Sequence, residues 1–161
     1  MRDVWCVRAD SGKFANNFVN GGYVGVGYGL TCSLAEVTTR EELNKIYRLM
    51  HPHETSSYVI GQRVGQVARF LLEIKEGDYV ITPAADNEWL YYGKITNKGY
   101  WFDPDSKDGC RYIHRRGVEW SKDKLRRSTF SVPFQTKIRS QRAVFSINQR
   151  DEFLTLVCAE G

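Results

Sequence analysis

The chain has 161 residues, of which 42% are hydrophobic, and carries a formal net charge of +4. This length is enough for one domain with its own core, and no apolar run approaches the ~20 residues that span a bilayer. The N-terminal segment has no continuous apolar region of the kind found in a signal peptide, so we expect a single domain over residues 1–161 in the cytoplasm.

The first third of the chain predicts two strands and two helices. Runs of β-branched and aromatic residues predict strands over residues 4–9 and 23–29. Glycines in the second run mark close approach by a ligand or by another backbone segment. Helices are expected over residues 14–20 and after Thr39, because Thr39 and Glu42 have the spacing of a capping box.

The central stretch, residues 61–96, predicts a helix, a tight turn and two strands. Apolar residues recur at three- and four-residue spacing between Val64 and Leu72. Gly77 and Asp78 form a turn signal, and strands are expected at residues 79–81 and 89–95. We expect this unit to build the core around which the rest of the chain folds.

Beyond residue 96, the expected elements are shorter. A turn is expected at residues 97–99, strands over residues 112–120 and 143–147, and a last helix after Asn148, while Pro133 is expected to end a mixed segment. The strands are aromatic and half polar, which disfavours a parallel doubly wound sheet. The sequence therefore predicts an α+β fold with a small, curved, largely antiparallel sheet or barrel and flanking helices.

Motifs for metal binding and catalysis are not found in the sequence. The four cysteines are far apart and form no CxxC pair, so we expect free thiols: Cys6, Cys32, Cys110 and Cys158. His51 and His53 flank Pro52 with no further ligand nearby, and are expected in a loop. We therefore predict no metal and no other cofactor.

The sequence also lacks a recognisable catalytic motif. It contains no GxSxG elbow and no P-loop. Glu73 and Lys75 have the acid-x-Lys spacing of a magnesium-dependent nuclease, but the only Pro-Asp pair follows them instead of preceding them. We therefore expect a binding protein rather than an enzyme.

Positive charge is concentrated in the last third of the chain. Between Lys107 and Arg150 there are twelve Lys or Arg residues and three Asp or Glu, whereas the remainder has a net charge of −5. Such segregation predicts a basic face for a polyanion, and the alternative is a solvated surface. The candidates for contacts to a nucleic-acid backbone are His114, Arg115, Arg116, Lys122, Lys124, Arg126 and Arg127. Arg115 and Arg116 are included because neighbouring strand residues point to opposite faces, and one of them should then face solvent.

Aromatic residues are numerous: four Trp, nine Tyr and eight Phe. Aromatic rings stack nucleic-acid bases and hold a base extruded from a duplex. Four of them lie at strand ends or beside glycines, where a pocket can open: Trp5, Tyr28, Tyr100 and Trp101. The alternative for each is a place in the hydrophobic core.

Several segments resemble EVE and YTH domains of the PUA-like superfamily. The helix-to-turn-to-strand segment Gly61–Val80 is similar to the signature of these domains, and residues 4–9 are similar to their opening strand. Tyr91–Ile95 and Arg116–Trp120 resemble two further strands of the family. Over residues 4–147 the order of these motifs resembles the N-terminal domains of Mrr-like and McrB-like restriction proteins.

This resemblance implies a pseudo-barrel with an aromatic pocket for a flipped, usually modified, base. It points to Tyr28, which stands where the family has Trp, and to Tyr100 or Trp101. Arg8 matches the family's basic residue after the first strand, and Asp10 is our candidate for a second polar group at the base edge.

The leading hypothesis is a reader of DNA with a modified base, serving as the specificity module of a restriction or defence system. A nuclease or NTPase domain or subunit is then the expected partner, and the chain is either a stand-alone reader or a domain of a larger protein. The alternatives are an RNA-binding module of the same fold and a small-molecule or nucleotide-processing enzyme.

Overall fold

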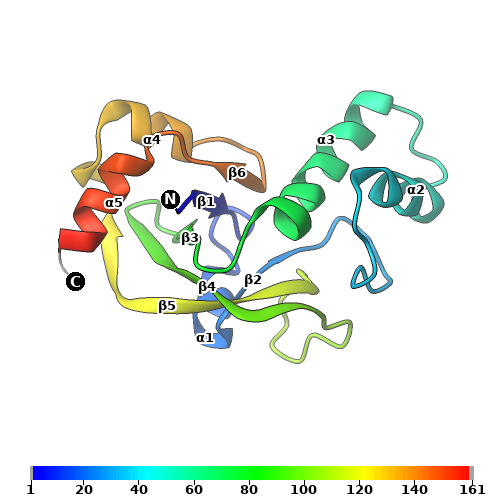
Figure 1. Cartoon of the computed structure of the whole chain (residues 1–161), viewed down its shortest axis with the longest axis horizontal. Coiled ribbons are helices and arrows are strands. Elements are labelled where there is room, and N and C mark those ends of the chain that lie inside the picture. Colours follow the sequence, from blue (N-terminus) through cyan, green and yellow to red (C-terminus); the bar gives the residue numbers. More distant parts are fainter. Residues whose placement is uncertain (1, 160–161) are drawn as a thin grey trace.

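The computed structural model describes residues 2–159, in which one six-stranded sheet is surrounded by helices (Figure 1). The strands are β1 (Val4–Val7), β2 (Tyr23–Val26), β3 (Tyr79–Pro83), β4 (Trp89–Phe102), β5 (His114–Arg126) and β6 (Val144–Ser146). The helices are α1 (Ala15–Gly21), α2 (Arg40–Met50), α3 (Ser57–Ala68), α4 (Val132–Ile138) and α5 (Arg150–Ala159), with a π-helical turn η1 (Arg69–Glu73) and a 3-10 turn η2 (Arg127–Thr129). The expected α+β class is confirmed.

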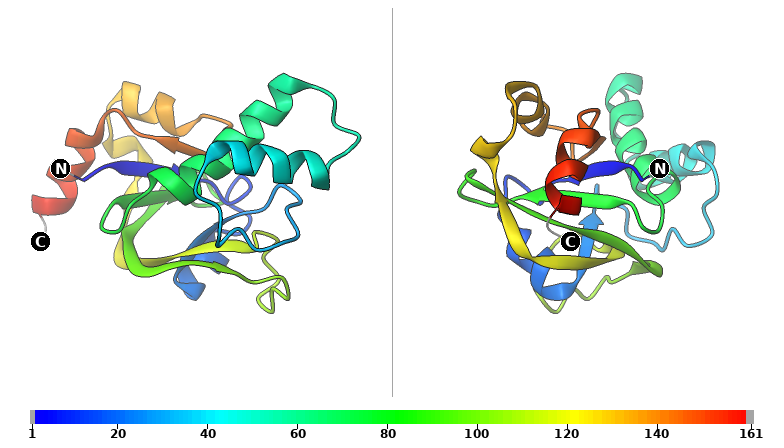
Figure 2. Two further views of the ribbon diagram at one scale, coloured as in Figure 1. Left: turned by 45° about the vertical axis from the view of Figure 1, so that its right-hand side comes forward. Right: turned by 60° about the vertical axis from the view of Figure 1, so that its left-hand side comes forward.

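The strand order is β2-β5-β4-β3-β1-β6. All neighbouring strands are antiparallel except β1 and β3, which pair in parallel with Trp5 opposite Val80. The long hairpin of β4 and β5 bends strongly along its length (Figure 2). The prediction of a curved, largely antiparallel sheet is therefore confirmed.

Three hydrophobic clusters hold the helices to this sheet. Because side chains alternate along a strand, β1 contributes Trp5 and Val7 to a cluster shared with α1, and Val4 and Cys6 to a cluster shared with α4 and α5. A third cluster joins α2, α3 and the segment after β2, with Leu43, Tyr47 and Val64 among its buried members. Helices α2 and α3 lie together at one end of the molecule, away from α4 and α5 (Figure 1).

The helix in the central stretch is longer than expected. Ser56 caps α3 by accepting a hydrogen bond from the Val59 backbone N–H at 3.2 Å, so the helix begins seven residues before Val64. Its last turn is π-helical, and the Ile74 N–H donates to the Arg69 carbonyl at 3.0 Å. The capping box is confirmed in part, because the Thr39 hydroxyl accepts from the Glu42 N–H at 3.2 Å.

Asp78 explains why the predicted turn contains an acidic residue. Its buried carboxylate accepts hydrogen bonds from Trp5 Nε1 at 3.1 Å, from the Lys75 N–H at 2.9 Å and from the Asp3 N–H at 3.2 Å. The turn at Gly77 and Asp78 is therefore confirmed, and Asp78 also fastens β1 to it.

Two boundaries expected after residue 96 are wrong. Strand β4 does not turn at residues 97–99 but continues to Phe102, because an irregularity in register between Ile95 and Tyr100 absorbs the interruption. Pro133 does not end a segment; it lies in the first turn of α4, where a missing N–H costs nothing.

Within residues 2–159 no helix is long and apolar enough to cross a membrane. The expectation of free thiols is confirmed, since all four cysteines are unpaired.

Candidate nucleic-acid interface

A cavity of about 500 Å³ opens where β1 and β2 end. One wall is the segment of residues 25–29, and the others come from the residue after β1, the segments before β5 and β6, and helix α3 with the connection that precedes it. Two tyrosines and three arginines line it: Tyr28, Tyr112, Arg8, Arg63 and Arg111. The cavity therefore combines aromatic rings with guanidinium groups.

The glycines of β2 let the segment before β5 approach closely. A side chain at Gly25 would lie 2.9 Å from the Tyr112 carbonyl oxygen and 3.0 Å from the Tyr112 Cβ. The prediction that these glycines mark close approach by another backbone is confirmed. This contact brings Tyr112 to the cavity that Tyr28 also lines.

The backbone at Tyr28 is held in the left-handed region. Tyr28 has φ 57° and Gly29 has φ 67°, and a Cβ on Gly29 would lie 2.7 Å from the His51 ring. His51 Nε2 lies 2.8 Å from the Tyr28 carbonyl oxygen, and because a carbonyl only accepts, Nε2 is the donor. These constraints fix the backbone conformation at Tyr28 and therefore the direction in which its side chain extends from the backbone.

The Tyr28 hydroxyl stays neutral around pH 7. Burial raises the pKa of Tyr28 to about 12. A neutral phenol both donates and accepts hydrogen bonds, so it offers a polar group beside its aromatic face.

Helix α3 and His51, which directly follows α2, supply a further part of the wall. His51 stacks on Tyr47 with ring centroids 4.3 Å apart, and Arg63 Nη1 donates to the Tyr47 hydroxyl at 2.7 Å. Tyr47 is fully buried. It therefore fixes both His51 and Arg63 at the cavity.

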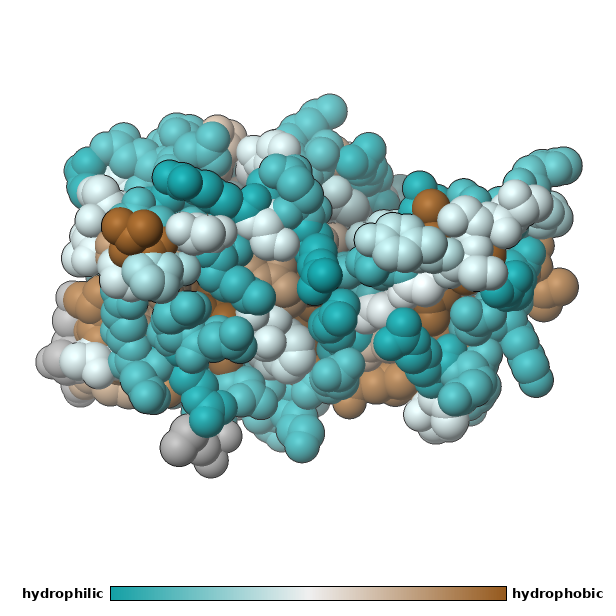
Figure 3. Space-filling model, turned by 90° about the horizontal axis from the view of Figure 1, so that it is seen from above, coloured by the Kyte–Doolittle hydropathy of each residue, from teal (hydrophilic) through white to brown (hydrophobic). Residues whose placement is uncertain are grey.

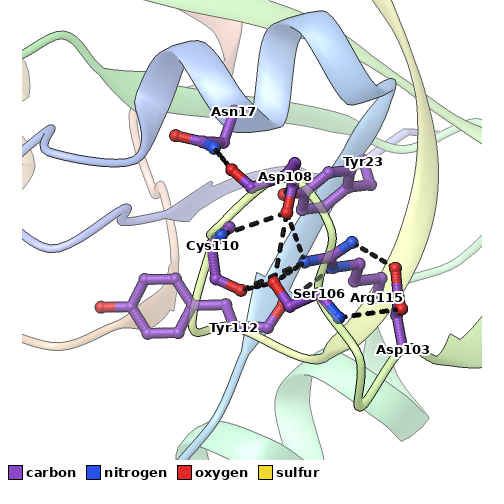
Figure 4. A network of polar contacts seen from close by, with 8 residues as sticks. All are labelled: Asn17, Tyr23, Asp103, Ser106, Asp108, Cys110, Tyr112 and Arg115. Carbon is purple, nitrogen blue, oxygen red and sulfur yellow. Dashed lines mark hydrogen bonds and ion pairs between the residues drawn. The ribbon is translucent and has the colours of Figure 1, made fainter.

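The segment that carries Arg111 and Tyr112 is anchored by Arg115 (Figure 4). The buried Arg115 guanidinium donates to Asp103 Oδ2 at 2.7 Å, to Asp108 Oδ1 at 3.2 Å and to the Tyr112 carbonyl at 2.9 Å. Its Cζ atom lies 4.1 Å from the Tyr23 ring centroid. Arg115 thus shapes the loop behind the cavity wall.

Of the predicted pocket residues, Arg8 and Tyr28 line the cavity. Arg8 also donates to the Ile138 carbonyl at 3.1 Å. Asp10 does not line it, but pairs with Arg111 at 3.0 Å. The Asp10 carboxylate is therefore linked to the cavity by its ion pair with the lining residue Arg111.

Tyr100 and Trp101 lie elsewhere. The Tyr100 hydroxyl accepts from the Leu34 N–H at 2.9 Å, and its ring packs on the α2–α3 cluster. Trp101 packs on the cluster shared with α1 and is covered by the Lys98 ammonium, 3.7 Å from its ring centroid. Both residues pack against the hydrophobic core, and neither lines the cavity.

The expectation that His114, Arg115 and Arg116 are surface contacts is wrong. All three are buried, with exposed fractions of 0%, 4% and 9%. Neighbouring strand residues do point to opposite faces, but here both faces of β5 are covered. The loop of residues 103–112 covers Arg115, and Arg116 Nη1 donates to the Phe70 carbonyl at 3.0 Å beneath η1.

The other predicted backbone contacts lie at the far end of β5. Lys122, Lys124 and Arg126 are exposed, and Arg127 is half-buried. Lys124 and Arg126 lie over the Trp89 ring, at 4.9 Å and 4.4 Å from its centroid. Lys122 and Arg126 follow His114 by eight and twelve residues, which corresponds to about 26 Å and about 40 Å along the strand.

Sequence reasoning missed four residues of the cavity: His51, Arg63, Arg111 and Tyr112. The sequence predicts His51 only as a loop residue without a metal, and within residues 2–159 there is no group of three His, Cys, Asp or Glu side chains that could hold a metal ion. Arg111 and Tyr112 stand close before the basic residues that begin β5, and this position is the signal that could have found them.

A family model described as a domain of unknown function (DUF8426) matches residues 5–148. The chain belongs to the DUF8426 family. The matched span runs from β1 to just past β6 and contains every residue that lines the cavity, whereas α5 of this DUF8426 protein lies outside it. No curated protein matches the chain.

Proposed function

We propose that this protein is a nucleic-acid-binding domain that holds one base of a strand in the cavity lined by Tyr28 and Tyr112. The single observation that carries the proposal is the meeting of two tyrosines and three arginines around one cavity of about 500 Å³. This volume lies within the range of small-ligand sites, and arginine is the usual partner of phosphate.

The proposal assigns a role to each group. A base stacks on a tyrosine ring, which contributes about 1–3 kcal/mol per base. The neutral Tyr28 hydroxyl and the His51 ring meet the base edge, while Arg8, Arg63 and Arg111 meet the phosphates on either side. Extruding a base from a duplex costs a few kcal/mol, which this stacking offsets.

In its finer form, the proposal is a PUA-like domain that reads a modified base in DNA for a restriction or defence system, in partnership with a nuclease or NTPase. The curved sheet with helices at both ends supports this form. Lys122, Lys124 and Arg126 are then outer contacts, reached only by a longer duplex.

The test is fluorescence anisotropy with matched DNA and RNA oligonucleotides, each with and without one methylated base, at fixed salt. We expect binding of DNA, with tighter binding of one modified form. Tighter binding of RNA would mean that the ligand is RNA and not DNA. Equal affinity for an oligomer of abasic sugar phosphates would mean that no base binds in the cavity.

A further inference from the structure

An open groove of about 450 Å³ adjoins the cavity. It shares Tyr28 and Arg63 with the cavity, and its other lining residues come from α3 and from the connection between α4 and β6. Tyr28 therefore stands between two spaces of similar size.

Beyond Tyr28, the groove is lined by polar side chains without a carboxylate: Gln62, Arg63, Gln66, Ser140, Gln141 and Arg142. Amides and hydroxyls both donate and accept hydrogen bonds, and guanidinium groups bind phosphate through two parallel bonds. Arg142 forms no ion pair with any residue in the described range 2–159, so its charge is not used within that part of the fold. The face over α3 and the α4–β6 connection is largely hydrophilic in Figure 3, with only scattered apolar patches.

The groove is a built feature of the fold. Gln66 is 3% exposed, and its Oε1 accepts from the Val144 N–H at 2.8 Å, which fastens α3 to the start of β6. Gln62 precedes Gln66 by one helical turn and so lies on the same side of α3. On the other side, the Arg142 N–H donates to the Ser140 hydroxyl at 3.3 Å, which closes the turn that presents Arg142.

We infer that this groove takes the neighbouring nucleotide of the same strand, with its phosphate on Arg63 and Arg142, so that Tyr28 lies between two successive nucleotides. The inference rests on the proposed function, because it assumes a base in the cavity. It adds that the unit recognised is at least a dinucleotide, read on both sides of one tyrosine.

The experiment is an NMR titration with the four deoxynucleosides, plain and methylated, and with dinucleoside monophosphates that contain the best-bound one. For the wild-type chain, we expect the dinucleoside monophosphate to bind at least tenfold more tightly than the nucleoside. Arg142→Gln should abolish this gain and leave nucleoside affinity unchanged. Arg48→Gln is the matched control, because Arg48 lies exposed on α2 and loses the same charge.

Gln62→Glu provides a second variant in case Arg142→Gln disturbs the α4–β6 connection, and it should also abolish the gain. The inference is overturned if nucleosides bind but the dinucleoside monophosphate does not bind tenfold more tightly. It is also overturned if this tenfold gain survives in both groove variants. In either case the base pocket stands. If no nucleoside and no dinucleoside monophosphate binds, the proposed function and the inference both fail.

Discussion

The hydroxyl oxygen of Tyr100 lies 2.7 Å from Nδ1 of His114, and this contact joins the end of β4 to the start of β5 inside the core. On the other side of the ring, His114 Nε2 lies 2.6 Å from the Leu30 carbonyl oxygen. Since a carbonyl only accepts, Nε2 carries the proton and Nδ1 accepts from Tyr100. This neutral imidazole holds the segment that follows Tyr28 and Gly29 at the cavity.

The first prediction is that stability falls in mild acid through His114. Burial lowers the pKa of His114 in the folded state. The unfolded chain then binds the proton more readily than the folded chain. The free energy of unfolding is therefore highest above the unfolded pKa of about 6.5. It decreases as the pH falls from there toward the folded pKa, by up to about 1.4 kcal/mol per pH unit. Urea denaturation between pH 8 and pH 5 measures this slope.

The controls separate His114 from the other histidines. His53→Ala, at an exposed position, should keep the slope, whereas His114→Gln should reduce it and destabilise the fold at pH 8. An unchanged slope in His114→Gln would show that this imidazole is not the responsible group.

The second prediction concerns the anchor at Arg115. Arg115→Ala should lower the free energy of unfolding by about 3 kcal/mol, the lower end of the cost of breaking a buried ion pair, because the two carboxylates are about one-third exposed. Arg115→Lys should restore little, since one ammonium cannot replace the planar guanidinium that reaches Asp103, Asp108 and the Tyr112 carbonyl. Equal stability of the wild-type and Arg115→Lys chains in urea denaturation would contradict this assignment.

The third prediction concerns Asp78. Asp78→Ala removes the acceptor for three hydrogen bonds, two of them from backbone N–H groups, and should cost about 2–3 kcal/mol. Asp86→Ala is a control in an exposed turn, where the carboxylate also accepts from backbone N–H groups. Thermal unfolding compares the two, and equal losses would mean that burial of Asp78 adds nothing.

The fourth prediction separates Tyr28 from Trp101. Tyr28→Ala should weaken oligonucleotide binding by about 1–3 kcal/mol, while Tyr28→Phe, which keeps the ring, should retain most of it. Trp101→Ala should leave affinity unchanged but destabilise the fold by about 2 kcal/mol, because this half-buried ring packs on the core. Affinity and melting temperature measured on the same three variants decide the matter, and a selective loss of affinity in Trp101→Ala would return that residue to the pocket.

The fifth prediction concerns salt dependence. Arg63→Gln plus Arg111→Gln should reduce the slope of log affinity against log salt by about 1.4, since each phosphate contact to a single strand contributes about 0.7. Lys122→Gln plus Lys124→Gln removes the same charge at the far end of β5 and should leave the slope for a short oligonucleotide unchanged. The opposite pattern would move the backbone contacts to the Lys122 end.

Local chemistry made much of the fold predictable. The capping residue Thr39, the turn at Gly77 and Asp78, and the aromatic strands all follow from interactions within a few residues. The length of β4 could not be predicted, because its continuation past residue 97 depends on pairing of Tyr100 with Arg116 on another strand. The start of α3 at Ser57, by contrast, follows from a local signal that the sequence already contained, the capping residue Ser56.

The site was predictable only where one segment contributes to it. Arg8 and Tyr28 stand at the ends of two recognisable strands. Arg115 and Arg116 were misplaced because their sequence is equally compatible with an exposed strand, and only the loop of residues 103–112 and the turn η1 bury them. Arg63 reaches the cavity through Tyr47, a contact between two helices that no local pattern encodes.

The most direct test of the central claim is an NMR titration of the ¹⁵N-labelled chain with a short oligonucleotide, followed through the backbone amides. If a base binds in the cavity, we expect the backbone amide signals of four lining residues to shift: Gly27, Gly29, Arg111 and Tyr112. Shifts confined to the exposed end of β5, around Lys122 and Lys124, with these four amides unmoved, would contradict the claim.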